Sequence, residues 1–165
     1  MIAAFDPGLA NLGIALLDLR AELVEAAVVV TAADKGARGD EQRRIAELAA
    51  RCLPIIRRAT LVAIEWPPSA FGSAGGHNRN SAAASTTGKV AAMIAGAAWG
   101  AGRAPWLAAP VTWRSRLGYR AGREAELHGA MMFRYGEQLA HVRRSLLPHA
   151  LDAIGLARAR LELAD

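Results

Sequence analysis

The alternation of apolar runs and turn residues at the start of the chain predicts three short strands. The first run, residues 2–5, ends at Asp6 and is followed by a Pro-Gly dipeptide, which is typical of a turn. Residues 13–18 and the valine-rich residues 23–30 are the next two strand candidates. Because only tight turns separate these runs, we expect them to form an antiparallel meander.

Farther along the chain, helical and strand-like patterns alternate. Helices are expected in four stretches, residues 40–56, 81–102, 123–135 and 146–162. Residues 61–65 and 106–109 are short apolar runs, and we expect them to form two further strands. The whole pattern predicts an α/β protein with a mixed sheet and helices on both faces.

The composition is that of one globular domain. The 165 residues are 53% hydrophobic, and neither a repeat nor a linker divides them, so we expect a single domain over residues 1–165. The longest uncharged apolar stretch is too short to cross a bilayer, and the first residues lack the pattern of a signal peptide. The single cysteine, Cys52, fits a reducing compartment, and together with these two observations it favours a cytoplasmic protein without a membrane partner.

Positive charge is concentrated in one part of the sequence. The formal net charge of the chain is +5, but residues 66–123 contain no Asp or Glu and seven Lys or Arg. All four tryptophans lie in the same segment. A basic stretch interleaved with aromatic residues indicates contact with a polyanion, most simply a nucleic acid.

Three carboxylates stand in unusually apolar surroundings. Asp6 and Glu65 each end an apolar strand candidate, and Asp152 lies within an apolar helix candidate, three residues after His149. Each acid has a simpler explanation when it is taken alone. Asp6 could cap a turn, Glu65 could be a surface charge at a strand end, and Asp152 could lie on a solvated helix face. If the strand ends converge, the four side chains form a mostly oxygen site suited to Mg²⁺ or Mn²⁺. Two such ions can activate water and stabilise the leaving oxygen in phosphodiester hydrolysis.

With these residues in view, the sequence resembles the RuvC family of Holliday-junction resolvases. The matching motifs are residues 4–15 (AFDPGLANLGIA), 62–65 (VAIE), 88–91 (GKVA), 117–123 (LGYRAGR) and 149–157 (HALDAIGLA). They occur in the family's order and cover nearly the whole chain.

The resemblance implies an RNase H-like fold and a homodimer that cuts four-way DNA junctions by paired nicks. It implies that the catalytic metal ligands are Asp6, Glu65, His149 and Asp152. They would bind two Mg²⁺ ions, for which Mn²⁺ would substitute, with Asp6 bridging the two. His149 stands where many family members have Asp and some have His.

The basic segment then supplies the expected DNA contacts. These are Trp66, Phe71, Arg79, Lys89, Arg114, Arg116, Arg120 and Arg123. Lys89 and Arg123 would neutralise phosphate charge near the cut, and the arginines between residues 114 and 120 would hold duplex arms. Trp66 and Phe71 could stack on unpaired bases. For each arginine the alternative is that it belongs to a solvated basic face without a DNA contact. The other three tryptophans, Trp99, Trp106 and Trp113, are expected to pack in the core or in an interface.

Three other functions compete with this one. The first is a non-catalytic module that binds branched DNA with the same fold, and the second is a RuvX-type nuclease. The third, an ATPase of the actin and sugar-kinase type, is disfavoured because such proteins enclose a nucleotide between two such domains. We therefore expect no nucleotide cofactor.

Overall fold

A single five-stranded mixed sheet forms the centre of the computed structural model, which describes residues 1–34, 36–67, 81–120 and 122–163. The strand order is β3 (Leu23–Val30), β2 (Asn11–Leu17), β1 (Ile2–Asp6), β4 (Leu61–Glu65) and β5 (Pro105–Ala108). The first three strands in sequence form the predicted antiparallel meander, and β4 and β5 continue the sheet in parallel with β1. The predicted α/β class is therefore confirmed.

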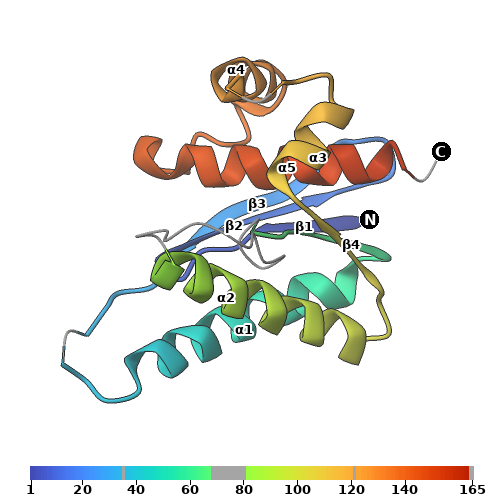
Figure 1. Cartoon of the computed structure of the whole chain (residues 1–165). Helices are drawn as coiled ribbons and strands as arrows, with labels where there is room; N and C mark the ends of the chain where they lie inside the picture. The colour runs from blue at the N-terminus through green and yellow to red at the C-terminus, as the bar shows by residue number, and fades with distance from the viewer. Residues whose placement is uncertain (35, 68–80, 121, 164–165) are drawn as a thin grey trace.

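Helices cover both faces of this sheet (Figure 1). The lower face carries α1 (Asp40–Arg58) and α2 (Ser81–Gly100), and the upper face carries α5 (Leu147–Leu161). Two further helices, α3 (Pro110–Arg116) and α4 (Glu124–Tyr135), pack on α5, and a short 3-10 helix, η2 (Arg144–Leu146), leads into it. None of the described helices is long and apolar enough to cross a membrane.

The central strand β1 is buried on both sides, which explains its uninterrupted apolar sequence. Ile2 and Ala4 face the cluster under α5, whereas Ala3 and Phe5 face the cluster over α1 and α2. Asp6 follows directly after these four residues, so its carboxylate lies at the end of β1, at the margin of the core and largely buried.

The structure differs from the sequence expectations at one helix. Helix α3 is absent from the predicted elements, although Pro110 occupies its first turn, a common helix-start signal. Its seven residues are too few to show a helical period. This short helix carries Trp113 and Arg114, both of which contact the candidate site.

Candidate active site

Two of the predicted acids leave the sheet side by side. Strands β1 and β4 are parallel neighbours in which Phe5 pairs with Ile64, so the next residues, Asp6 and Glu65, end both strands at the same edge. His149 and Asp152 lie near the start of α5, which packs across β1 and β2. The predicted convergence of strand ends and helix is thus present.

Asp6 and His149 are in direct contact. His149 Nδ1 lies 2.7 Å from Asp6 Oδ2, and the two residues are 143 positions apart in the sequence. Their approach depends on Gly13 of β2: a Cβ at this position would lie 2.1 Å from the carbonyl oxygen of His149 and 3.2 Å from Asp6 Cβ. The absence of a side chain at Gly13 allows α5 to rest directly on the sheet beside Asp6.

We expect Gly13→Ala to lower the free energy of unfolding by about 3 kcal/mol, because the new methyl group meets fixed backbone atoms. Denaturant unfolding monitored by fluorescence measures this loss. Gly129→Ala is the matched control, since an added Cβ in this exposed helical position meets nothing within 4 Å. Alanine there should be neutral or stabilise the protein by up to about 1 kcal/mol. Equal stability of the two variants would contradict the close packing.

Negative charge at the site is only partly compensated. Burial, together with the negative charges of Asp6 and Asp152, raises the pKa of Glu65 to about 7. Burial is also the main cause that raises the pKa of Asp6, followed in that direction by the charge of Asp152, while the hydrogen bond from His149 opposes the rise. Acidic groups whose protonated form is favoured in this way are common at functional sites.

Trp113 orients Glu65. Its indole Nε1 donates a hydrogen bond to Glu65 Oε2 at 2.8 Å, and its ring is fully buried. The ring packs on α5 at Gly155, where a Cβ would lie 2.7 Å from ring atom Cζ3. The expectation that Trp113 packs in the core is confirmed, but its hydrogen bond to a candidate catalytic acid is a finding of the structure.

Asp152 is held by two residues from α3 and α4. Its Oδ1 lies 3.0 Å from His128 Nε2 and 3.4 Å from a terminal nitrogen of Arg114. The other terminal nitrogen of Arg114 donates to Glu124 at 2.8 Å, and the guanidinium lies over the ring of Trp113. Arg114 is expected from the sequence to hold a DNA arm, but here its charge is bound by carboxylates. His128 has no sequence signal, since only the fold brings it to Asp152.

The four candidate ligands fit a divalent cation by chemistry rather than by their present geometry. Among the residues that the structure describes, no group of three or more His, Cys, Asp and Glu side chains is arranged to hold a metal ion. Asp6, Glu65 and Asp152 are each turned to a hydrogen-bonding partner instead. Their burial and mutual repulsion nevertheless favour a cation, which would neutralise their negative charge. Because each acid is turned to another partner, the side chains would have to rotate before they could share that cation.

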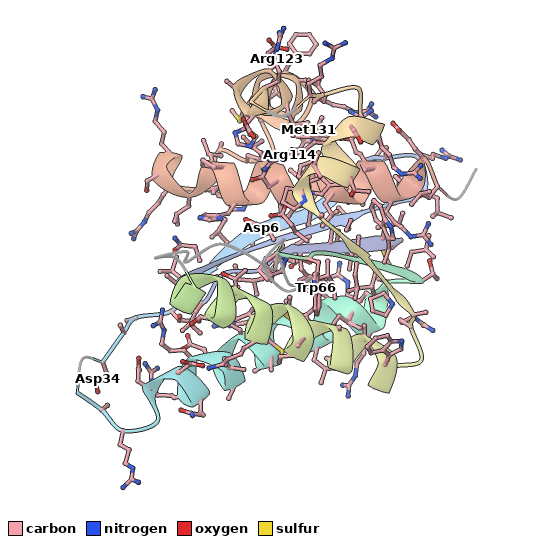
Figure 2. All side chains as sticks on the ribbon, viewed as in Figure 1. Asp6, Asp34, Trp66, Arg114, Arg123 and Met131 are labelled. Atoms are coloured by element: carbon pink, nitrogen blue, oxygen red, sulfur yellow. The ribbon has the colours of Figure 1, made fainter. Side chains whose placement is uncertain are left out.

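The other predicted DNA contacts lie at varied distances from these acids. Phe71 and Arg79 fall outside the described residues, and Trp66 packs partly against the cluster over α1 and α2. Arg116 and Arg120 are exposed. Arg123 forms an ion pair with Glu126 and lies on the outer side of α4, away from Asp6 (Figure 2). Arg123 is thus not among the groups gathered around Asp6, and its role near the cut stays a prediction.

Lys89 lies on α2, on the opposite face of the sheet from α4 (Figure 1). Its Nζ forms an ion pair with Glu41 at 2.6 Å, and its side chain is 54% exposed. An exposed pair of this kind contributes little to stability, so its ammonium group remains available to a phosphate.

Solved structures of resolvases share this architecture. Thermus thermophilus RuvC in complex with a Holliday junction substrate aligns with a TM-score of 0.73 and 22% sequence identity, covering 99% of this chain and 93% of that chain. A second structure of Thermus thermophilus RuvC aligns with a TM-score of 0.72 and 22% sequence identity, covering 99% of this chain and 94% of that chain. The Fowlpox virus resolvase in complex with substrate Holliday junction DNA aligns with a TM-score of 0.54 and 16% sequence identity, covering 99% of both chains.

Neither the protein-family models nor the curated proteins compared with the sequence match it. The structural alignments nonetheless cover nearly the whole chain and confirm the RNase H-like architecture implied by the sequence motifs. The chain thus has the fold of the RuvC Holliday-junction resolvases.

Proposed function

We propose that this protein is a metal-dependent endonuclease that resolves four-way DNA junctions by paired nicks. One observation carries the proposal: Asp6, Glu65, His149 and Asp152 converge at one edge of the sheet, in a fold shared with two resolvases solved with Holliday junction DNA. The burial of the acids and the raised pKa values of Asp6 and Glu65 support a cation-binding role.

The four converging side chains would hold two Mg²⁺ or Mn²⁺ ions, which when bound activate a water molecule and stabilise the leaving oxygen. The chain's other residues orient these ligands. His149 and Asp6 fix each other through their hydrogen bond, Trp113 positions Glu65, and His128 positions Asp152. Such supporting contacts typically influence metal affinity by about 10- to 100-fold.

The DNA is expected to lie along the basic segment that continues from α3. Arg116 and Arg120 are exposed there, and Arg120 and Arg123 line a hollow of about 230 Å³ with Tyr119. Exposed guanidinium groups suit phosphate oxygens, and such contacts position a duplex without specifying its sequence.

Cleavage of an end-labelled, immobile four-way junction in Mg²⁺ or Mn²⁺ tests the proposal. A linear duplex and a replication fork of the same sequence serve as control substrates. We expect paired nicks near the branch point of the junction and no cutting of the duplex. Binding without cutting would favour the non-catalytic module, and cutting of every branched substrate would favour a general debranching nuclease.

We further propose that the protein acts as a homodimer, because paired nicks require two active sites. The outer face of α2 supports a dimer contact. Ala92, Gly96 and Gly100 recur there at four-residue spacing and are exposed, and the neighbouring Trp99 is 60% exposed. Small residues in this pattern let a second helix approach closely, and Trp99 offers an aromatic anchor.

Gly96→Leu is expected to weaken this dimer at least about 100-fold, a loss of about 3 kcal/mol, because leucine separates the two helices. Light scattering over a range of protein concentrations measures the change in mass. Gly129→Leu, on the exposed side of α4, is the control and should leave the dimer intact. A wild-type protein that stays monomeric at all concentrations would contradict the proposal.

A further inference from the structure

Strand β3 is an open edge of the sheet. It pairs with β2 on one side, and within the described part of the chain no strand pairs with its other side. Next to the strand, Thr31 N donates to Ala10 O at 3.0 Å. Because hydrogen-bonded pairs alternate along an antiparallel ladder, Ala27 and Val29 also face β2. The backbone groups of Ala26, Val28 and Val30 therefore point outward.

Most of this edge lacks the features that normally protect one. The outward carbonyl of Ala26 is covered by His141 Nε2 at 3.0 Å, but in the described residues no hydrogen bond reaches the outward groups of Val28 and Val30. Residues 26–30 contain no charge and no proline, and Val30 is 53% exposed. Natural edge strands usually carry charges, proline or bulges that prevent pairing. The bulge of β3 lies at its other end, opposite Leu16 and Leu17.

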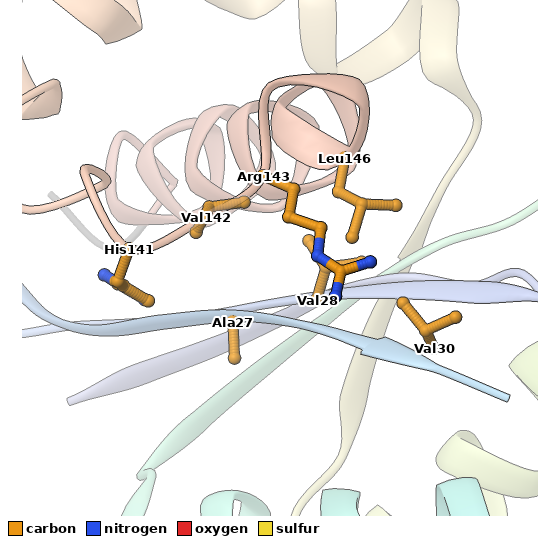
Figure 3. Close-up of a pocket in the computed structure, with 7 residues that line it drawn as sticks. All are labelled: Ala27, Val28, Val30, His141, Val142, Arg143 and Leu146. Atoms are coloured by element: carbon orange, nitrogen blue, oxygen red, sulfur yellow. The ribbon is translucent and has the colours of Figure 1, made fainter.

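Hollows flank this edge on both faces of the sheet. One of about 480 Å³ lies between β3 and the segment before α5, and Figure 3 shows Val28, Val30, Val142, Leu146 and Arg143 around it. The other, of about 580 Å³, lies between β3 and α1 and is lined by Val29, Pro54 and Ile55, among others. Alternate side chains of a strand point to opposite faces. A strand added to β3 would therefore place its side chains in both hollows in turn.

The charges around the edge select the partner. His141 and Arg143 line the first hollow, and none of the described residues around it is a carboxylate. In the second hollow Glu25 is paired with Arg58, and Glu47 lies 3.5 Å from Arg43, which also pairs with Asp40, whereas Arg51 has no ion pair among the described residues. The charges lining the second hollow are thus balanced, and the first hollow, with Arg143, supplies the preference for a negatively charged partner.

We propose that the outer edge of β3 binds an extended acidic segment of a partner protein by strand addition. A peptide backbone supplies both the donors and the acceptors that Val28 and Val30 lack, whereas a DNA phosphate supplies acceptors alone. A second copy of this chain would bring its own positive side chains against Arg143. The proposal concerns a surface outside the candidate active site and does not depend on nuclease activity.

The test uses the full-length protein and the peptide acetyl-Ser-Val-Glu-Val-Thr-Val-Glu-Ser-amide, with a control in which both Glu are Lys. Binding is followed by the amide NMR shifts and the hydrogen exchange of Val28 and Val30. We expect the acidic peptide to bind at least about 10-fold more tightly than the basic one. Two N-methylated isomers, each blocking alternate N–H groups, should differ by at least about 10-fold, since only one set faces β3.

Two protein variants complete the test. Arg143→Glu, at an exposed side chain, should reverse the preference between the acidic and basic peptides. Val28→Pro removes an outward N–H and should weaken binding of the acidic peptide at least about 10-fold. If Val28→Pro does not fold, the result with Arg143→Glu still decides the test.

Several results would overturn the proposal. One is no saturable binding of the acidic peptide at about 1 mM, which corresponds to about −4 kcal/mol. Equal binding of the two N-methylated isomers would exclude strand addition. Protection of Val28 and Val30 that rises with protein concentration alone would identify a second copy as the occupant, and protection by junction DNA but not by peptide would identify nucleic acid.

Discussion

Replacing Asp6 with Asn is expected to reduce cleavage of a four-way junction at least about 1000-fold while leaving junction binding unchanged. Asparagine keeps the shape of the side chain and can still accept the hydrogen bond from His149. It removes a negative charge that would help to hold the metal ions, and a factor of 1000 corresponds to about 4 kcal/mol of lost transition-state stabilisation. Single-turnover cleavage and a gel-shift assay measure the two properties separately.

Asp34→Asn is the matched control for this variant. Asp34 is exposed in the connection between β3 and α1, far from Asp6 (Figure 2), and its substitution should change neither cutting nor binding. Cleavage by Asp6→Asn within 10-fold of the wild-type rate would remove Asp6 from the catalytic machinery. Loss of cutting and binding together would instead indicate a folding defect, which thermal unfolding would detect.

The metal-free protein is expected to become less stable as the pH rises from about 5 to about 8. Glu65 loses its proton near 4.5 in the unfolded chain but at about 7 in the folded protein. Between these values the folded state holds a proton that the unfolded state has released, so the free energy of unfolding falls with rising pH, by about 3 kcal/mol for this group. The pKa of His149 is raised by its hydrogen bond to Asp6, and this shift acts in the same direction.

Urea unfolding in the presence of a chelator, at several pH values, measures this loss. Glu65→Gln should flatten most of the pH dependence, whereas Glu126→Gln, on the exposed surface of α4, should retain it. Adding Mg²⁺ at pH 8 should restore stability to the wild-type protein, because a cation binds the ionised acids of the folded state. A stability that rises between pH 5 and pH 8 without metal would contradict the buried, like-charged arrangement.

The elements that the sequence predicts well are those with a local signal. Strand β1 is predicted to be buried because its four residues before Asp6 are all apolar. Helix α1 is predicted because its apolar residues recur at helical spacing. The acids Asp6, Glu65 and Asp152 are recognisable because a carboxylate in an apolar run needs a partner. Their order and spacing also carry the resemblance to the RuvC family.

The contacts that orient these acids could not be predicted in the same way. Trp113 and Glu65 are 48 residues apart, and His128 and Asp152 are 24 residues apart. Such pairs meet only because α3 and α4 pack on α5, and no local pattern encodes that packing. For the same reason the sequence shows that Arg114 and Arg123 are positive, but not that Arg114 is half-buried against Glu124 and Asp152 while Arg123 forms an exposed ion pair with its neighbour Glu126.

The position of α5 also sets the order in which the candidate site can assemble during synthesis. Asp6 and Glu65 leave the ribosome early, but His149 and Asp152 belong to the last helix in the chain order. That helix fits onto the sheet at Gly13 and receives Trp113 at Gly155. A chain folded only as far as β4 would therefore carry two of the three candidate acids without Asp152 and His149, so the candidate site is complete only after α5 has packed on the sheet.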